Sequence, residues 1–483
     1  MKTIYKKEKT IIILFILLLL CDLIFSFLQY YYSPLHGDIE NGVLPNSEVQ
    51  EIINDPFGIN TIKTGNFHPN PNRFFSHYAF MKYFQNVPIW LQELINPITS
   101  VYLSGAIAKI IIQILFICFL SIFISGGKKI LKKDFLLAAI LITPLFQVYG
   151  YWSRMGIVDK SIAYTFFYGL PLTLLIIFYI PIFKNLLYGY RIKSIYYLLL
   201  IPLSIILPFS GPLIPGVILI ICLLVFGGRI FYYNPKISFN IKNIFKTVPI
   251  PIILLLIFVS VLSAYSLYLG KFDSNYLSDS IPLLERYSKL PSGIYSQVFH
   301  SLGFPLVLII IGLNVYIIKT RIHISESAKI LTVLKWIGIF ILIYILLLPL
   351  GGYRPYRPEI IRYDTFMPIT AALIFFFGYS TFFILKHFAS KNRNYYVVTI
   401  AISLLIFTFS DTSGIHKNAC EKKSLEIIAN SPDKIVKIQT DCKVFSWSYI
   451  TDYRLTELKG ELLYKWNITS EKKLYYLEKN VKE

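Results

Sequence analysis

The stretch Thr10–Phe27, TIIILFILLLLCDLIFSF, decides the fold of this chain. A single helix needs about 20 such residues to cross the hydrocarbon core of a bilayer. Four lysines precede the run, and the polar segment Ser33–Pro45, SPLHGDIENGVLP, follows it closely. No small-residue cleavage site follows the run, so we expect an uncleaved first membrane helix with a polar segment just outside it.

Apolar runs of this kind recur along the first 410 residues. The chain has 483 residues, of which 55% are hydrophobic, and its mean hydropathy is +0.59. This composition is typical of membrane proteins, and it predicts an all-α polytopic membrane protein with about eleven transmembrane helices. The runs fall at about 11–29, 99–125, 135–150, 161–183, 195–209, 212–227, 248–268, 302–318, 333–350, 366–385 and 396–410. The pair 195–209 and 212–227 could be two crossings or a re-entrant pair.

The formal charge of +20 does not indicate a nucleic-acid partner, because most cations in the first 410 residues lie in short loops between apolar runs. With the N-terminus inside, 22 Lys and Arg fall in the inner segments and 11 in the longer outer loops. This asymmetry follows the positive-inside rule. It predicts a protein of the bacterial inner (plasma) membrane with a cytoplasmic N-terminus, an extracytoplasmic C-terminus and the lipid bilayer as its first partner.

Three parts of the chain are expected outside the bilayer on the far face. Residues 1–410 form the transmembrane domain, which includes an outer loop at 30–98 and a second at 269–301. Within the first of these loops, Val87–Ile95 mixes Trp and Leu with Gln and Glu, and this predicts a short interfacial helix. Residues 411–483 should form an extracytoplasmic cap of α/β type, with helices at 422–429 and 456–464 and a strand around 436–450. Cys420 and Cys442 could form a disulfide there.

The first cluster that could carry chemistry is His36, Asp38 and Glu40, just after the first helix. A carboxylate at the membrane surface can take a proton from an incoming hydroxyl when its surroundings place its pKa suitably. In an extended segment Asp38 and Glu40 would share one face. The alternative is an ordinary solvated exit from the bilayer, with a turn at Gly37.

A second cluster lies in Phe67–Phe84, where His68, Arg73 and His77 stand among aromatic residues. Polar donors beside aromatic faces suit a sugar, whose C–H faces pack on rings while its hydroxyls need directed hydrogen bonds. The two histidines have no clean metal-ligand spacing. A turn between interfacial aromatics would explain the same pattern.

Two further outer turns carry charges close to the hydrocarbon edge. Arg154 and Asp159 lie in the first, where they could bind a ligand or simply pair with each other. The second, Gly351–Thr365, contains Arg354, Arg357 and Arg362. Arginines in an outer loop run against the positive-inside rule, and arginine suits phosphate recognition. Pairing with Glu359 and Asp364 is the alternative.

Motifs for nucleotide and zinc chemistry are absent from the sequence. It has no Walker-type glycine-rich loop, no GxGxxG, no CxxC pair and no zinc-protease motif. ATP is therefore not the expected source of energy within this chain.

The chain resembles the GT-C-type integral membrane glycosyltransferases. The features that carry the resemblance are the acidic motif HGDIE after the first helix, the large first loop, about eleven crossings, basic residues in a later outer loop and a C-terminal outer domain. The resemblance is architectural, and HGDIE alone supports it at the level of a motif. It implies a polyprenyl-phosphate-linked sugar as donor, an acceptor of unknown identity, and inverting transfer on the extracytoplasmic face. In that family the acids are often adjacent, whereas here they are separated by Ile39.

Carried over to this chain, the resemblance makes Asp38 the candidate base and Glu40 its helper or a ligand of a divalent metal, Mg or Mn. Arg354, Arg357 and Arg362 become candidates for the lipid phosphate, which they would hold as the leaving group. Two other classes compete. A non-catalytic scaffold or subunit of an envelope or secretion complex would use the loops for docking. A secondary transporter would need broken helices and charges at mid-membrane, of which Asp22 and Pro208–Gly216 are the only hints.

Overall fold

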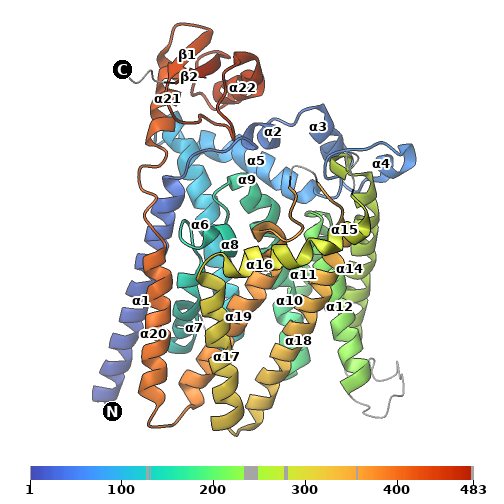
Figure 1. The fold of residues 1–483 in the computed structure, drawn as a ribbon, viewed down its shortest axis with the longest axis vertical. Coiled ribbons are helices and arrows are strands. Elements are labelled where there is room, and N and C mark those ends of the chain that lie inside the picture. Colours follow the sequence, from blue (N-terminus) through green and yellow to red (C-terminus); the bar gives the residue numbers. More distant parts are fainter. Residues whose placement is uncertain are drawn as a thin grey trace.

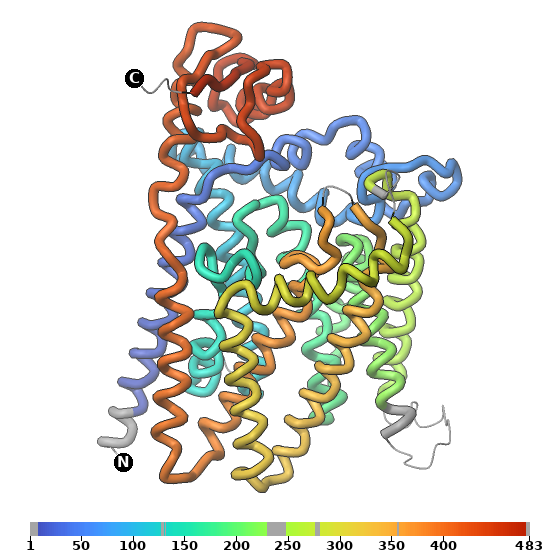
Figure 2. Tube along the Cα trace, in the orientation of Figure 1, coloured from blue at the N-terminus to red at the C-terminus, as the bar shows by residue number. Residues whose placement is uncertain are grey.

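The computed structural model describes residues 2–126, 130, 132–232, 248–276, 281–354 and 357–479. It is a bundle of long helices with a layer of short helices and a small α/β unit at one end (Figure 1). The N-terminus lies at the opposite end, and the chain passes repeatedly between the two ends (Figure 2). We call the end that carries the α/β unit the cap end.

Eight helices of the described chain are long and apolar enough to cross a membrane. The chain is therefore a mainly helical integral membrane protein, as predicted. The eight are α1 (Lys2–Tyr31), α6 (Pro97–Ser125), α10 (Leu170–Tyr188) with the preceding α9 (Ile162–Tyr164) and the π-helical turn η2 (Thr165–Gly169), α14 (Ile250–Leu269) with η4 (Gly270–Phe272), α17 (Gly303–Arg321), α18 (Ser325–Leu347) with η6 (Leu348–Gly351), α19 (Tyr363–His387) and α20 (Arg393–Ser410).

The other three predicted segments are shorter apolar helices, so the structure does not establish eleven crossings. They are α7 (Lys133–Ile142) with η1 (Thr143–Leu145), α11 (Ser194–Ile206) with η3 (Leu207–Phe209), and Leu213–Gly228, which is the apolar part of α12 (Leu213–Tyr232). The helix expected over 135–150 ends early because residues 148–150 form a turn whose three N–H groups donate to Asp411. The turn between η3 and α12 reaches the cap end, where Gly211 N–H donates to Asn72 O.

The centre of the bundle is α19, which packs against α17, α7 and α6. In the most apolar 18-residue part of α19, 78% of the residues are buried. The same fraction is 6% in α1 and 11% in α18. All three helices are apolar on every side, so burial follows from position in the bundle. The exposed apolar surfaces of α1 and α18 are then the surfaces available to lipid.

The loop 30–98 folds into helices that lie over the cap end of the bundle (Figure 1). These are α2 (Ile39–Val43), α3 (Ser47–Asn54), α4 (Ile59–Thr64) and α5 (Phe74–Leu91). The interfacial helix expected at Val87–Ile95 is instead the last turn of the much longer α5 followed by a turn; Trp90 in the helix and Leu94 in the turn remain 64% and 84% exposed. Four other short elements complete this layer: α8 (Trp152–Met155), η5 (Ser274–Tyr276), α15 (Leu283–Ser288) and α16 (Leu290–Phe299).

The tail forms the α/β cap that the sequence predicted. Its elements are α21 (Ala419–Asn430), β1 (Ile435–Gln439), η7 (Tyr453–Thr456), α22 (Glu457–Lys465) and β2 (Leu474–Glu478). Cys420 and Cys442 are joined by a disulfide. The strand expected over 436–450 ends at Gln439, because its parallel partner β2 is only five residues long. The alternation of residues around 436–450 could not reveal this partner strand.

Candidate functional site

Asp38 lies at the cap end, at the start of α2, and is partly exposed. Among the described residues none donates a hydrogen bond to its carboxylate. The segment before it is held by the cap, because the His36 ring stacks on Trp447 with 4.5 Å between ring centres. A Cβ at Gly37 would lie 2.8 Å from the Trp447 backbone nitrogen. The glycine therefore permits the close approach that brings Trp447 beside Asp38.

His36 itself is positioned to stay neutral. Burial, together with the nearby ammonium groups of Lys109, Lys160 and Lys443, lowers its pKa to about 4. A neutral imidazole stacked on an indole forms a flat aromatic surface next to Asp38. This is a suitable surface for the apolar face of a sugar ring.

Glu40 has a different setting from Asp38. It is buried and forms an ion pair with Lys459 of α22. Burial raises its pKa, and the Lys459 ammonium partly opposes that effect. The two acids do not share a face as in an extended strand, because Glu40 lies within helix α2 and residues two apart in a helix point about 200° away from each other. Glu40 therefore joins the first loop to the cap, whereas Asp38 stays accessible.

Tyr164, at the end of α9, lies close both to Asp38 and to Arg357 of the loop before α19. Arg357 Nη2 donates to the Tyr164 hydroxyl at 2.5 Å. The Asp38 carboxylate acts electrostatically on the same hydroxyl. The Tyr164 ring centre also lies 6.0 Å from that of Trp447. The first loop, the loop before α19 and the cap thus meet at one tyrosine.

Two of the three predicted arginines share one buried carboxylate. Arg357 Nη1 lies 3.1 Å and Arg362 Nε 3.0 Å from Asp364. The Asp364 side chain is 3% exposed, while the two arginines are 21% and 27% exposed. The expected pairing with Asp364 is therefore confirmed, and one carboxylate holds both guanidinium groups. Guanidinium groups held in this way are preorganised for a further anion.

Arg354 lies in a different cluster. Its Nη2 donates to Asn70 Oδ1 at 3.0 Å and to Asp273 Oδ2 at 3.1 Å. His68 joins the same cluster through its backbone, which forms a bridge with Asp273. These contacts connect the loop before α19 to the two long outer loops. Arg354 and His68 thus lie at a loop junction.

Arg73 and His77 are buried behind a pocket. The Arg73 guanidinium carbon lies 4.9 Å from the ring centre of Phe167 and 5.4 Å from that of Tyr168. Arg73 Nε and both ring nitrogens of His77 are buried without a hydrogen-bond partner in the described chain. Burial and the Arg73 charge lower the pKa of His77 to about 3, so this histidine is neutral.

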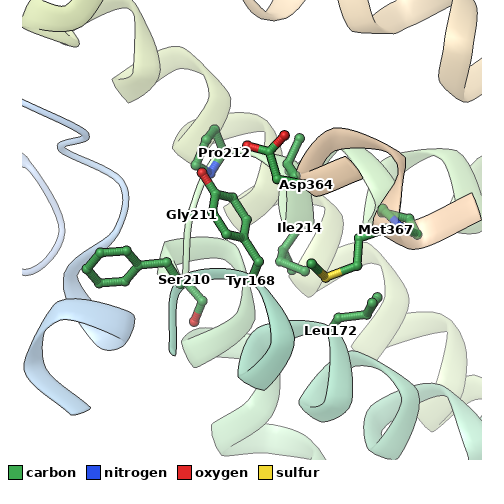
Figure 3. A pocket seen from close by; sticks show the side chains of 11 residues that line it. Tyr168, Leu172, Ser210, Gly211, Pro212, Ile214, Asp364 and Met367 are labelled. Carbon is green, nitrogen blue, oxygen red and sulfur yellow. The ribbon is translucent and has the colours of Figure 1, made fainter. Parts of the chain in front are cut away.

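The pocket itself lies between η2, residues 210–214 and the start of α19 (Figure 3). Asp364 forms one wall and is the only charged residue of the described lining; Arg357 and Arg362, which pair with it, are not lining residues. Gly211 forms another, and a Cβ added there would lie 3.4 Å from Arg73 Nε. The remaining lining is mostly apolar. We call this the arginine pocket, after the two arginines that pair with Asp364; its own lining suits an apolar group.

Arg154 and Asp159 do not form the ion pair considered from the sequence. Asp159 is buried and accepts hydrogen bonds from Tyr363 Oη at 2.6 Å and from Ser161 N–H at 2.7 Å. Burial raises the pKa of Asp159 to about 6, and these two bonds partly offset the rise. Arg154 instead uses its carbonyl to accept from Gln297. The reason for the difference is that Asp159 points inward, toward α19.

Several residues of this region were missed by the sequence reasoning. Tyr164 and Trp447 stand in aromatic-rich stretches where nothing marks them. Lys109 could have been found, because it is the single charged residue of Pro97–Ser125.

The metal prediction finds no support in the donor set. Among the described residues, no group of three His, Cys, Asp or Glu side chains could hold an ion. Glu40 is already paired with Lys459, so Asp38 would be left as a lone ligand. The reaction proposed below therefore uses only side chains of this chain.

Comparison with known proteins gives no relative: no family model, no curated protein and no solved structure matches this chain.

Proposed function

We propose that this protein is an integral membrane glycosyltransferase that moves a sugar from a polyprenyl-phosphate donor to an acceptor on the extracytoplasmic face. The observation that carries the proposal is that Tyr164, which accepts a hydrogen bond from Arg357, is also close enough to Asp38 to interact with it electrostatically. A scaffold would not need an accessible carboxylate and a preorganised pair of guanidinium groups at one place.

The donor would lie with its lipid in the bilayer and its phosphate near Arg357 and Arg362. The arginine pocket, apolar except at the Asp364 wall, suits the part of the donor next to the phosphate. The flat surface of His36 and Trp447 suits the sugar or the acceptor. This arrangement would hold both reactants close to the carboxylate that is to act.

The reaction is then an inverting substitution at the anomeric carbon. Asp38 takes the proton of the acceptor hydroxyl as its oxygen forms the new bond to that carbon. The bond from the anomeric carbon to the phosphate oxygen breaks, and the electron pair leaves with the lipid phosphate. The Arg357 and Arg362 guanidinium groups stabilise the negative charge that develops on this leaving group.

The test compares lipid-linked sugars extracted from cells that make the wild-type protein, Asp38→Asn or no protein. We expect the wild type to deplete one lipid-linked sugar, and Asp38→Asn to leave it at the level of cells without the protein. Glu48→Gln, which alters an exposed acid of the same loop, is the matched control and should behave as wild type. Depletion by Asp38→Asn would exclude Asp38 as the base. Unchanged lipid-linked sugars with the wild type would contradict the transferase proposal itself.

A second test concerns the donor site. Arg357→Gln should weaken the binding of a polyprenyl phosphate by roughly tenfold or more, because a charge-assisted hydrogen bond to phosphate is lost. Arg454→Gln, which changes an exposed arginine of the cap, is the control. Equal affinities for the two variants would remove Arg357 from the donor site.

A further inference from the structure

A second pocket, which shares no lining residue with the arginine pocket, lies at the cap end of α1. Its walls come from the end of α1, from α6 and from the chain just before α9. Ser33, Pro34 and Leu35, which immediately precede His36, form one wall. Two lysines, Lys109 and Lys160, line this pocket and no acidic residue does. We call it the lysine pocket.

Lys109 is a buried cation with few partners. Its side chain projects from α6, and the residue is 3% exposed. Its ammonium group donates to the carbonyl of Lys160 and lies 5.6 Å from the ring centre of Tyr30. Within the described chain it forms no ion pair. A lysine in a membrane helix is costly unless an anion compensates it. The buried Asp159 carboxylate acts on this ammonium group electrostatically but forms no ion pair with it, so an anion inside the pocket would be a closer partner.

Lys160 is held by aromatic rings alone. Its ammonium nitrogen lies 4.1 Å from the ring centre of Trp152 and 4.5 Å from that of Tyr149. Lys417 approaches the same Tyr149 ring, at 3.5 Å. The described residues give neither ammonium group an ion-pair partner. Burial and the Lys417 charge lower the pKa of Lys160. The charges of Asp159 and Asp411 partly oppose this lowering of the pKa.

We infer that the lysine pocket binds a phosphate group. Two ammonium groups face a cavity without acids, and lysine is a common phosphate ligand that acts as a point charge. The position at the cap end of α1 and α6, both membrane-crossing in length, suits a phosphate carried by a lipid headgroup or by a soluble molecule. Nothing else in the lining neutralises the two charges.

The placement of the two pockets suggests which reactant carries this phosphate, and this step rests on the proposed function. The segment 160–168 contributes to both pockets: Lys160 and Ile162 line the lysine pocket, and Phe167 and Tyr168 line the arginine pocket. Tyr164, near Asp38, lies between these residues. With the donor in the arginine pocket, the phosphate in the lysine pocket belongs to the acceptor. The acceptor is then a phosphorylated molecule.

Binding can be measured on the full-length protein in an uncharged maltoside detergent, with inorganic phosphate as the probe. Trp152 is a built-in reporter, because an anion that draws Lys160 away changes the environment of its indole. Lys160→Met should weaken phosphate binding by about tenfold or more, as expected for the loss of one charge-assisted contact. Lys271→Met removes another lysine that lies over an aromatic ring, 5.1 Å from the centre of Tyr268, and should change the affinity less than about twofold.

A second pair of variants blocks the pocket without changing any charge. Gly105 lines the lysine pocket, and a Cβ added there meets nothing within 4 Å. Gly105→Val should therefore fold and should abolish phosphate binding by filling the space. Gly312 of α17 has the same open surroundings but lies outside this pocket. Gly312→Val should bind phosphate as the wild type does.

Short-chain dihexanoyl phosphatidic acid distinguishes the two sources of phosphate. Binding tighter than that of inorganic phosphate indicates a lipid headgroup, and equal binding indicates a soluble phosphate; both support the site. No phosphate binding by the wild type, or equal affinities for Lys160→Met and Lys271→Met, would overturn it. Binding is read without any sugar transfer, and Asp38→Asn should bind phosphate normally. Failure of this site and failure of the transferase proposal are therefore separate results.

Discussion

Asp38 and Glu40 show how two neighbouring acids acquire different roles. From spacing alone they form one acidic pair, and an extended segment would expose both. The helical turn at α2 separates them, so that Glu40 enters the interface with the cap and Asp38 remains at the surface. The partner that decides this outcome, Lys459, lies 419 residues further along the chain. Local sequence carries no sign of such a contact.

Removal of the Glu40 charge should strongly destabilise the protein. Glu40→Gln leaves the Lys459 ammonium buried without its anion, which typically costs about 3–5 kcal/mol. The control is Glu457→Gln in the same cap, which breaks an ion pair with Lys472 whose side chains are 62% and 40% exposed. That change should cost less than about 1 kcal/mol. Thermal unfolding in one detergent compares them, and equal midpoints would show that the Glu40 pair is not a buried pair in solution.

His77 should make the protein less stable in acid. Its pKa is about 3 in the folded chain and 6.5 in the unfolded chain. Between these values the unfolded chain binds a proton that the folded chain does not, so stability falls as the pH drops from 6.5 toward 3. One such group contributes a slope of up to about 1.4 kcal/mol per pH unit.

His77→Leu should flatten this pH dependence and should be at least as stable as the wild type at pH 7. Both ring nitrogens are buried without partners, so an apolar side chain removes an unsatisfied group. The exposed His300→Leu provides the comparison. Unfolding free energies measured from pH 7 to pH 4 check this expectation. An unaltered slope in His77→Leu would place the acid sensitivity elsewhere.

At the scale of elements, the long apolar helices were predictable and the connections between them were not. Each apolar segment proposed from the sequence is helical over at least part of its length, because hydropathy is a property of the segment itself. The end of the 135–150 segment unwinds to place three N–H groups on Asp411, which is far away in sequence. Strand β2 depends likewise on a distant partner. The predicted ends of helices and strands are therefore wrong at positions where residues distant in sequence supply the hydrogen bonds.

The cap should detach locally when Glu421 of α21 is removed. Its buried carboxylate accepts from Leu35 N–H at 2.7 Å, from Tyr102 Oη at 2.7 Å and from Phe445 N–H at 2.8 Å. It thus joins the first loop, α6 and the cap. Glu421→Ala leaves these buried donors without an acceptor, at a cost of about 1–3 kcal/mol for each.

Limited proteolysis measures this detachment. Trypsin should cut after the exposed Lys417, which precedes α21, at least roughly tenfold faster in Glu421→Ala than in the wild type, because cleavage follows the population of the opened state. Glu426→Ala changes an exposed acid of the same helix and should leave the rate unchanged. A cap that stays equally resistant in both variants would mean that other contacts hold it.

At the scale of the whole molecule, the outer loops and the cap gather at one end and the N-terminus lies at the other (Figure 1). Counting lysines and arginines in loops was enough to predict that Asp38 and Arg357 share a face. It could not show that Tyr164 joins them or that Arg354 belongs to another cluster, because these follow from tertiary contacts. The sequence therefore predicts on which face of the molecule the candidate site lies. Which residues of that face lie close together follows only from the fold.

The orientation of this face in the cell is the remaining prediction. The disulfide between Cys420 and Cys442 in the cap and the excess of lysine and arginine in the opposite loops both favour an extracytoplasmic cap. Two single substitutions in the full-length chain test it: Ser470→Cys on the exposed surface of the cap and Ser390→Cys in the exposed loop between α19 and α20.

A membrane-impermeant maleimide added to intact cells should label Ser470→Cys and not Ser390→Cys, and lysis should make Ser390→Cys reactive. The wild type gives the background, because its free cysteines lie within the helices of the bundle. The reverse pattern would place Asp38 and both pockets in the cytoplasm. A lipid-linked donor would then have to be used on the inner leaflet, and the extracytoplasmic part of the proposed function would fail while the geometry of the site remained.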